Sequence, residues 1–214
     1  MYADGHSFFT YMSDNADSLS SCCRLRNEIQ DNGFSYTLGA GGVSTGSKSV
    51  LTINLNRCVQ YAVNKKMDYK EYLSHVIDLC HKVQLAYNEN LKDLLRHHML
   101  PLFDAGYINI DRQYLTIGIN GLVESAEFMG LDITPNDKYK EYVQGVLGLI
   151  ETYNKQYRTK EAMFNCEMIP AENVGVKHAK WDKADGYFVP RDCYNSYFYR
   201  VEDNSLTILD KFRL

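Results

Sequence analysis

Residues 50–55 read VLTINL, a short run rich in β-branched side chains that predicts a buried β-strand. Downstream, residues 68–96 carry apolar side chains at spacings of three and four, which predicts one long amphipathic helix. Asp68 is in position to cap this helix, with Glu71 as its capping-box partner, and Pro101 follows its expected end. The sequence therefore predicts a strand followed by a long helix.

Strands and helices continue to alternate along the chain. Short apolar runs at 114–119 and 162–169 predict two further strands. Between them, helical patterns cover 122–129, with Gly130 as the expected C-cap, and 137–157. Because strands alternate with helices, the sequence predicts an α/β fold with parallel strand pairing.

Composition narrows the class of protein. The 214 residues are 45% hydrophobic and 23% charged, which suits a folded domain rather than a disordered chain. The net charge is -4, and no basic face is evident, so no nucleic-acid partner is expected. No apolar run approaches the roughly 20 residues that span a membrane. No secretory signal is visible either, so we expect a cytoplasmic protein without membrane contact.

The cysteines suggest free thiols rather than a metal site or disulfides. Without a secretory signal we expect reduced side chains, and their spacing shows no zinc-site pattern. Adjacent cysteines in an extended chain point to opposite faces, so one of Cys22 and Cys23 can face a cavity while the other packs. The alternative is two buried small hydrophobic side chains. The six are Cys22, Cys23, Cys58, Cys80, Cys166 and Cys193.

A glycine-rich stretch precedes the first strand. Residues 39–49 read GAGGVSTGSKS, which indicates a tightly turning loop. A phosphate-binding loop is a weaker interpretation, because no glycine directly precedes Lys48 and a strand follows where a helix is required. A loop that bends closely around something is favoured.

Polar residues after the third predicted strand form another candidate site. Residues 170–175 read PAENVG, and Glu172 would lie at the carboxyl end of the strand, where sites gather in α/β folds. The alternative is a solvated turn. Adjacent His97 and His98 point about 100° apart on a helix, so a metal pair is not expected there. Residues 187–209 are expected to form strands and turns.

Several stretches together resemble the anaerobic, class III ribonucleoside-triphosphate reductases. They occur in the family's order and approximate spacing, and the similarity runs the length of the chain. The stretches are 21–26 (SCCRLR), 49–57 (SVLTINLNR), 164–173 (FNCEMIPAEN) and 191–196 (RDCYNS).

The resemblance implies part of a ten-stranded α/β barrel of the glycyl-radical enzyme and ribonucleotide reductase type. Two antiparallel five-stranded halves form that barrel, and a finger loop carries a cysteine through it. Residues 1–214 would be a single segment of the catalytic barrel domain. The N-terminal effector region, the glycyl-radical domain and its four-cysteine zinc site are expected to lie outside this chain, which alone should not turn over nucleotides.

The resemblance also assigns roles to residues. Cys23 matches the cysteine that becomes a thiyl radical, with Cys22 as the alternative. Asn54 matches a residue that binds the substrate hydroxyls. Glu172, preferred over Glu167, matches a carboxylate that assists proton transfer. The residues expected near the substrate phosphates are Ala171, Glu172 and Asn173.

The implied activity is anaerobic reduction of ribonucleoside triphosphates for DNA precursor synthesis. No cofactor is expected in this chain, and the full enzyme would carry a glycyl radical installed by an S-adenosylmethionine/4Fe-4S activating enzyme. Expected partners are the ribonucleoside triphosphate, the remaining parts of the reductase, the activating enzyme and, in the full enzyme, a second identical subunit.

Two alternatives remain open. One is another glycyl-radical enzyme, similar to pyruvate formate-lyase, which also uses adjacent cysteines. The Ile53-Asn54-Leu55 motif and the basic residues Arg24 and Arg26 favour the reductase over it. The other alternative is a non-catalytic remnant or interaction module that has kept the fold.

Overall fold

The computed structural model describes residues 18–20, 26–28, 46–169 and 172–214. The chain divides into two compact units. The first comprises Met1–Val50, Val83–Thr116 and Tyr157–Asn165, and the second comprises Leu51–Lys82, Ile117–Gln156 and Cys166–Leu214.

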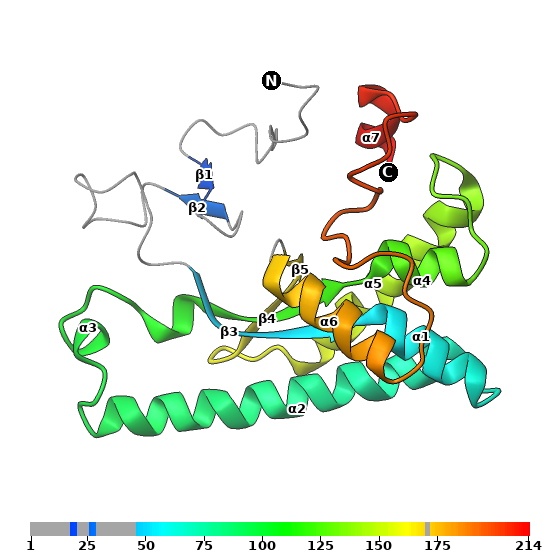
Figure 1. The fold of residues 1–214 in the computed structure, drawn as a ribbon. Helices are drawn as coiled ribbons and strands as arrows, with labels where there is room; N and C mark the ends of the chain where they lie inside the picture. The colour runs from blue at the N-terminus through cyan, green and yellow to red at the C-terminus, as the bar shows by residue number, and fades with distance from the viewer. Residues whose placement is uncertain (1–17, 21–25, 29–45, 170–171) are drawn as a thin grey trace. The chain divides into compact units, whose positions relative to one another are not determined.

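The central sheet has three strands in the order β3-β4-β5 (Figure 1). The strands are β3 (Gly46–Asn54), β4 (Gln113–Asn120) and β5 (Met163–Met168). Thr116 bonds to Asn165, and further along both strands the Ile169 amide donates to the Ile119 carbonyl. Because both pairings advance in the same direction, β4 and β5 are parallel. A separate antiparallel pair joins β1 (Ser18–Ser20) to β2 (Arg26–Glu28).

Helices connect the strands, as the predicted alternation requires. Between β3 and β4 lie α1, α2 and the short α3 and η3, and between β4 and β5 lie α4 and α5. Two more helices follow β5. Their bounds are α1 Leu55–Asn64, α2 Tyr69–Arg96, α3 Pro101–Asp104, η3 Ile110–Arg112, α4 Leu122–Phe128, α5 Asp137–Tyr157, α6 Glu172–Ala184 and α7 Ile208–Arg213.

The predicted long helices are confirmed, as are Asp68 and Gly130 at helix ends. Helix α2 matches the predicted 68–96, and Asp68 Oδ1 accepts a 3.0 Å hydrogen bond from the Lys70 amide at its start. Helix α5 has the predicted bounds, and α4 ends just before Gly130, whose φ of 72° is left-handed. No helix in the described ranges is long and apolar enough to cross a membrane.

The first predicted strand is correct in place but wrong in extent. Strand β3 starts earlier, at Gly46, and stops at Asn54, so Leu55 already belongs to α1. The cause is the Asn54 side chain, which accepts a hydrogen bond from the Arg57 amide and so caps the helix. Only Ile53 of this strand is buried, because β3 is at the end of the described sheet order, whereas seven of the eight residues of β4 are buried.

Two further expectations near the C-terminus were wrong. Residues 170–175 do not form a solvated turn throughout, because α6 begins at Glu172. Residues 187–207 contain no strand, and α7 follows, with a capping box between Thr207 and Asp210. Hydrogen bonds with distant parts of the second unit hold this segment instead of strand pairing, for example 2.6 Å from the Tyr139 hydroxyl to the Phe198 carbonyl.

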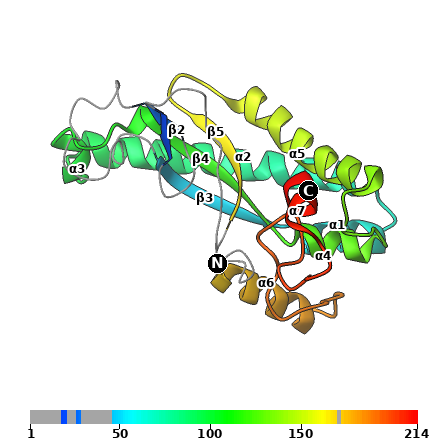
Figure 2. The same ribbon diagram turned by 90° about the horizontal axis from the view of Figure 1, so that it is seen from above.

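Each unit has its own apolar core. In the first unit, Leu115, Ala162 and Phe164 pack with Leu85 and Tyr157. The second unit has the larger core, to which β4, α1, α2, α4 and α5 all contribute, and α1 lies beside α4 (Figures 1 and 2). Its fully buried members include Leu55, Ile77, Ile117, Ile119, Leu122, Val123, Ile133 and Ile150.

Candidate functional site

The carboxyl ends of the three parallel strands each lead into a helix. Strand β3 ends at Asn54 and α1 starts at the next residue, while β4 ends at Asn120 and α4 starts at Leu122. The helix after β5 starts at Glu172. Sites in α/β folds gather at such strand ends, because the helix N-termini there present free amide groups. The polar side chains of the second unit concentrate at this edge.

Asp182 is the centre of this polar cluster. Its side chain, on α6, is fully buried. The Asn54 amide nitrogen lies 3.0 Å from both carboxylate oxygens. Asp182 also accepts hydrogen bonds of 2.6 Å from Arg57 Nε and 2.7 Å from the Tyr194 hydroxyl. These donors satisfy a buried carboxylate that would otherwise be costly.

Arg57 joins a carboxylate of α6 to a carboxylate that directly follows the end of this helix. Its Nε bonds to Asp182, and its Nη2 lies 2.6 Å from Asp185. The guanidinium group also lies over the ring of Tyr187, 5.0 Å from the centroid. Asp185 is 54% exposed and Asp182 is buried, so these two carboxylates give Arg57 one solvent-accessible partner and one buried partner.

Buried amides in α1 extend the cluster. The Asn56 amide donates 2.7 Å to the Tyr194 hydroxyl and 2.9 Å to the Phe188 carbonyl. One turn later, the Gln60 amide donates 2.8 Å to Asn56 Oδ1, and Gln60 Oε1 accepts from the Phe188 amide. Helix α1 therefore binds the segment after α6 through polar side chains rather than apolar ones.

A second group lies at the end of β4. His178 Nδ1, on α6, lies 3.0 Å from Asn120 Oδ1. The Asn120 amide donates to the Asn195 carbonyl at 3.4 Å and to the Ser196 hydroxyl at 3.5 Å. Burial lowers the pKa of His178, and the charge of Asp182 opposes this only in part. A neutral imidazole that donates from Nδ1 fits this geometry.

An ion-pair network anchors the segment after α6 to α4. Arg191 Nη1 lies 2.6 Å from Glu124 and 2.8 Å from Glu127, and Glu124 also accepts from the amide and side chain of Asn195. Burial raises the pKa of Glu124, against the hydrogen bonds from Asn195 and the charge of Arg191. These contacts fix the position of Asn195 and Tyr194 beside the strand ends.

Three of the four described cysteines are buried or half-buried, and only Cys193 is exposed. Burial raises the pKa of Cys58 to about 12 and that of Cys166 to about 12, and it also raises the pKa of Cys80. A thiol of this kind stays protonated at neutral pH and is a poor nucleophile. Cys193 is exposed, and its Sγ lies 3.8 Å from the Tyr194 carbonyl oxygen.

No cluster of three or more His, Cys, Asp or Glu residues in the described ranges is arranged to hold a metal ion. His97 and His98, which were not expected to share an ion, are both solvent-exposed at the end of α2, with side chains 66% and 83% exposed.

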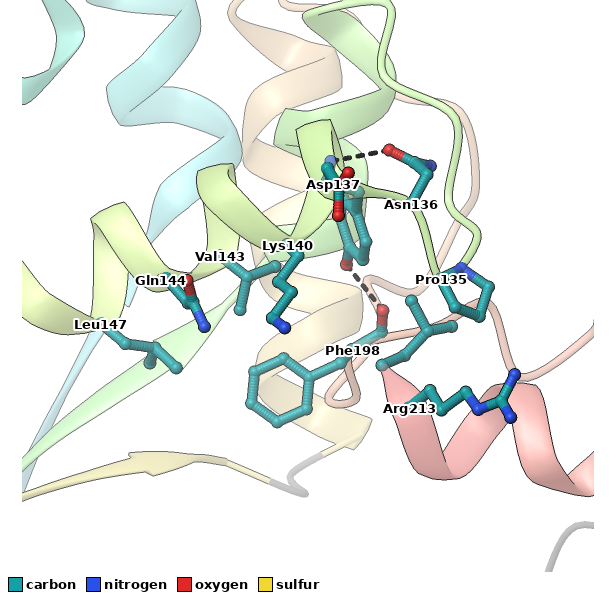
Figure 3. Close-up of a pocket in the computed structure, with 11 residues that line it drawn as sticks. Pro135, Asn136, Asp137, Lys140, Val143, Gln144, Leu147, Phe198 and Arg213 are labelled. Carbon is teal, nitrogen blue, oxygen red and sulfur yellow. Dashed lines mark hydrogen bonds between the residues drawn. The ribbon is translucent and has the colours of Figure 1, made fainter.

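A hollow of about 440 Å³ opens elsewhere in the second unit, beside the start of α5 (Figure 3). The Lys140 and Arg213 side chains and the Phe198 ring line it, and Figure 3 shows Val143 and Leu147 on its α5 side. None of the residues expected to be functional from the sequence contributes to this hollow.

The structure places some of the expected site residues and not others. Cys22, Cys23 and Ala171 lie outside the described residues. Asn54 is half-buried at the strand ends, bonded to Asp182. Glu172 begins α6, and Asn173 is exposed in its first turn.

The residues that organise this edge were mostly missed from the sequence. Arg57 and Asn195 fell inside stretches quoted for the family resemblance, yet no role was assigned to them. Asn120 had a detectable signal, because it is followed by Gly121 at the end of a predicted strand. Asp182 and His178 had none, since they lie in a helix that was not predicted.

Comparison with known proteins places this arrangement in a family. Residues 2–214 match the family described as anaerobic ribonucleoside-triphosphate reductase. No sequence among the curated proteins matches the chain.

Solved structures of one such enzyme share the fold. The anaerobic ribonucleotide reductase from Thermotoga maritima with citrate in the active site is 27% identical, with a TM-score of 0.72, over 80% of this chain and 33% of that chain. The same enzyme in complex with dATP and CTP is 28% identical, with a TM-score of 0.71, over 78% of this chain and 29% of that chain. This chain thus spans about a third of the length of these relatives. The match along residues 2–214 confirms the resemblance seen in the sequence, and the chain belongs to the anaerobic ribonucleoside-triphosphate reductase family.

Proposed function

We propose that this chain forms the central part of the catalytic subunit of an anaerobic ribonucleotide reductase and contributes to its substrate site. The family match over residues 2–214 carries the proposal. The buried polar cluster at the strand ends supports it, because amide and carboxylate groups held at fixed positions suit the recognition of sugar hydroxyls. Nucleoside triphosphates are the proposed substrates, and deoxynucleotides for DNA synthesis are the products.

Cys23 is the proposed radical residue, with Cys22 as the alternative. A thiyl radical at Cys23 would take the 3′ hydrogen of the ribose, and the 2′ hydroxyl would then leave as water. A reductant from outside this chain, formate or a thiol protein, would supply the two electrons that reduce the sugar, and the 3′ hydrogen would be returned from Cys23. Glu172 is proposed to assist the proton transfer to that leaving hydroxyl. The radical itself would be generated on a glycyl residue outside residues 1–214.

The start of α6 is proposed to lie near the substrate phosphates. This helix has 13 residues, begins at Glu172 and is the next described element after β5. Free amide groups and the helix dipole at such an N-terminus favour anions. Ala171 and Asn173 flank this position, so their backbone amides are candidates for phosphate contacts.

The rest of the proposed enzyme lies beyond this chain. The three-stranded sheet would be part of the ten-stranded barrel of the family, completed by the remaining parts of the reductase. An activating enzyme with S-adenosylmethionine and a 4Fe-4S cluster would install the radical, and two such subunits would form the full enzyme.

Reconstitution tests the proposal. The chain is combined anaerobically with the remaining parts of the reductase, the activating enzyme, S-adenosylmethionine and a reductant, and conversion of CTP to dCTP is measured. Cys23→Ala and Cys22→Ala variants are run in parallel. Activity that is lost with Cys23→Ala and kept with Cys22→Ala is the expected result.

Radical content provides the control for this assay. The glycyl radical is quantified by electron paramagnetic resonance in every sample. An assembly that carries the radical but makes no dCTP would contradict the proposed function and favour a non-catalytic remnant. Activity that survives Cys23→Ala and disappears with Cys22→Ala would instead move the radical assignment to Cys22.

A further inference from the structure

We infer that Asp182 is a positioning residue that fixes the orientation of the Asn54 side-chain amide and thereby decides which polar atoms Asn54 presents to a ribose hydroxyl. The inference rests on the proposed function, since it concerns the same substrate site. It assigns a role to a residue in α6, whereas the resemblance assigned one only to Asn54.

An asparagine amide has a donor end and an acceptor end, and it can turn over unless its neighbours distinguish them. On one side, both oxygens of Asp182 lie 3.0 Å from Asn54 Nδ2. On the other side, the backbone amide of Arg57 donates to Asn54 Oδ1 at 3.1 Å. A carboxylate only accepts and a backbone N–H only donates, so the reversed amide would face two repulsive contacts.

The two contacts leave part of the Asn54 amide unused. Its nitrogen carries two hydrogens, and one hydrogen directed between the two equidistant Asp182 oxygens accounts for both short distances. Counting partners among the described residues alone, a second N–H and a second lone pair on Oδ1 then remain available. A sugar hydroxyl both donates and accepts, so it matches this adjacent donor and acceptor. Asn54 is half-buried, so part of the residue is exposed in the described structure.

Asp182 is itself held in place. Arg57 Nε, the Tyr194 hydroxyl and the Asn56 amide donate to it at 2.6, 2.7 and 3.3 Å, and its side chain has no exposed area. A ligand at Asn54 therefore meets an amide whose orientation is set before binding. Such preorganisation saves the free energy of ordering the amide in the complex.

The chain offers a matched control for this role. Asp185 directly follows the end of α6 and also pairs with Arg57, at 2.6 Å. It makes no hydrogen bond to Asn54 among the described residues, so Asp185→Asn removes a carboxylate from Arg57 without touching the amide. Asp182→Asn makes the same chemical change and replaces the acceptor-only partner of Asn54 with a group that can both donate and accept.

An exchange of the two side chains separates positioning from folding. In the double variant Asn54→Asp/Asp182→Asn, residue 54 still has an oxygen to cap α1, and the amide at 182 can donate to the carboxylate at 54. The hydrogen bond between the positions is kept. However, residue 54 then has no N–H to offer a substrate.

The variants are compared in the reconstituted reductase by CTP reduction, by thermal unfolding and by glycyl-radical content. We expect Asp182→Asn to lower kcat/KM about tenfold or more, with a raised KM, and Asp185→Asn to stay within about twofold of wild type. The double variant should unfold closer to the wild-type temperature than Asp182→Asn does, while its kcat/KM stays low.

Three results would overturn the inference. They are equal losses in Asp182→Asn and Asp185→Asn, wild-type kcat/KM in Asp182→Asn, and a double variant that recovers kcat/KM together with stability. A wild-type assembly that carries the radical and makes no dCTP would instead overturn the proposed function, and the inference with it.

Discussion

The Tyr194 hydroxyl donates a 2.7 Å hydrogen bond to Asp182, joining the segment after α6 to the helix itself. The same hydroxyl accepts a hydrogen bond from Asn56, also at 2.7 Å. The phenol ring is 98% buried, so neither polar group can turn to solvent if the hydroxyl is lost. Burial and the hydrogen bond with Asp182 both raise the pKa of Tyr194, so it is a donor at neutral pH. Tyr194 thus connects three elements of the second unit.

Tyr194→Phe should destabilise the chain by about 1–3 kcal/mol, because it leaves buried partners with one hydrogen bond fewer. The free energy of unfolding in guanidinium chloride measures the effect. Tyr87→Phe is the control, since Tyr87 is 43% exposed and its hydroxyl has no hydrogen bond within the described ranges. It should change stability by less than about 0.5 kcal/mol. If Tyr194→Phe and Tyr87→Phe change the free energy of unfolding equally, the buried hydrogen bonds of the Tyr194 hydroxyl do not stabilise the fold.

Gly118→Ala should also destabilise the fold. A Cβ atom at this position of β4 would lie 2.5 Å from Ile169 Cγ1 and 2.7 Å from Thr52 Oγ1, so neighbouring side chains must move. We expect a loss of about 1–3 kcal/mol, typical of overpacking. Unfolding curves measure it.

Gly148→Ala provides the opposite case. Gly148 is exposed within α5, and a Cβ atom there meets nothing within 4 Å. Alanine should stabilise the helix by about 0.5–1 kcal/mol, because glycine loses more conformational freedom on folding. If Gly118→Ala and Gly148→Ala shift the free energy of unfolding in the same direction, close packing around Gly118 does not determine the effect of Gly118→Ala.

The stability of the chain should depend on pH through His178. Burial lowers its pKa in the folded state, so the folded chain binds a proton less readily than the unfolded one. Its contribution is therefore present above the unfolded histidine pKa, near 6.5, and is lost as the pH falls through the lower folded value. Asp182 and Arg57 face the imidazole with opposite effects on this pKa.

We expect wild type to lose more stability than His178→Gln between about pH 7 and pH 5, since glutamine does not titrate. Unfolding free energies at a series of pH values measure the difference. His75→Gln is the control, because His75 is exposed on α2. An NMR titration midpoint for His178 at or above that of a free histidine would rule out the predicted dependence.

Thiol reactivity should follow burial. At pH 8 we expect iodoacetamide to modify the exposed Cys193 and to leave Cys58 and Cys166 unmodified, because burial raises the pKa of each buried thiol to about 12. Peptide mass spectrometry after timed labelling reads out each site. Labelling in denaturant should modify all three equally. Fast modification of Cys58 in the folded chain would show that α1 opens readily.

Local patterns predicted the longer elements because their signals lie within them. The spacing of apolar side chains located α2 and α5, and the left-handed Gly130 located the end of α4. Helix α1 also had such a pattern, with Leu55, Cys58 and Ala62 among its buried residues. It was missed because it starts at the residue directly after β3, without a turn between them.

Helix α6 could not be found from hydrophobic spacing. Its buried positions do recur at helical intervals, but they are occupied by Gly175, His178, Ala179 and Asp182 instead of large apolar residues. A buried face of this kind is recognisable only once its partners are known. Those partners include Asn54 and Arg57, more than 120 residues earlier in the chain. The polar site at the strand ends was therefore invisible to local sequence analysis, except where the family resemblance pointed to Asn54.

The polar start of α1 has a consequence for the order in which its contacts form during synthesis. Asn56 bonds to Phe188 and Tyr194, which are 132 and 138 residues further along the chain. At bacterial or eukaryotic elongation rates, the ribosome needs on the order of ten seconds to make that stretch. Throughout this interval Phe188 and Tyr194 have not yet been made, so a buried Asn56 amide would lack these two partners. The nascent chain must therefore keep this end of α1 in water. A segment translated much later thus supplies the partners of residues that were made long before.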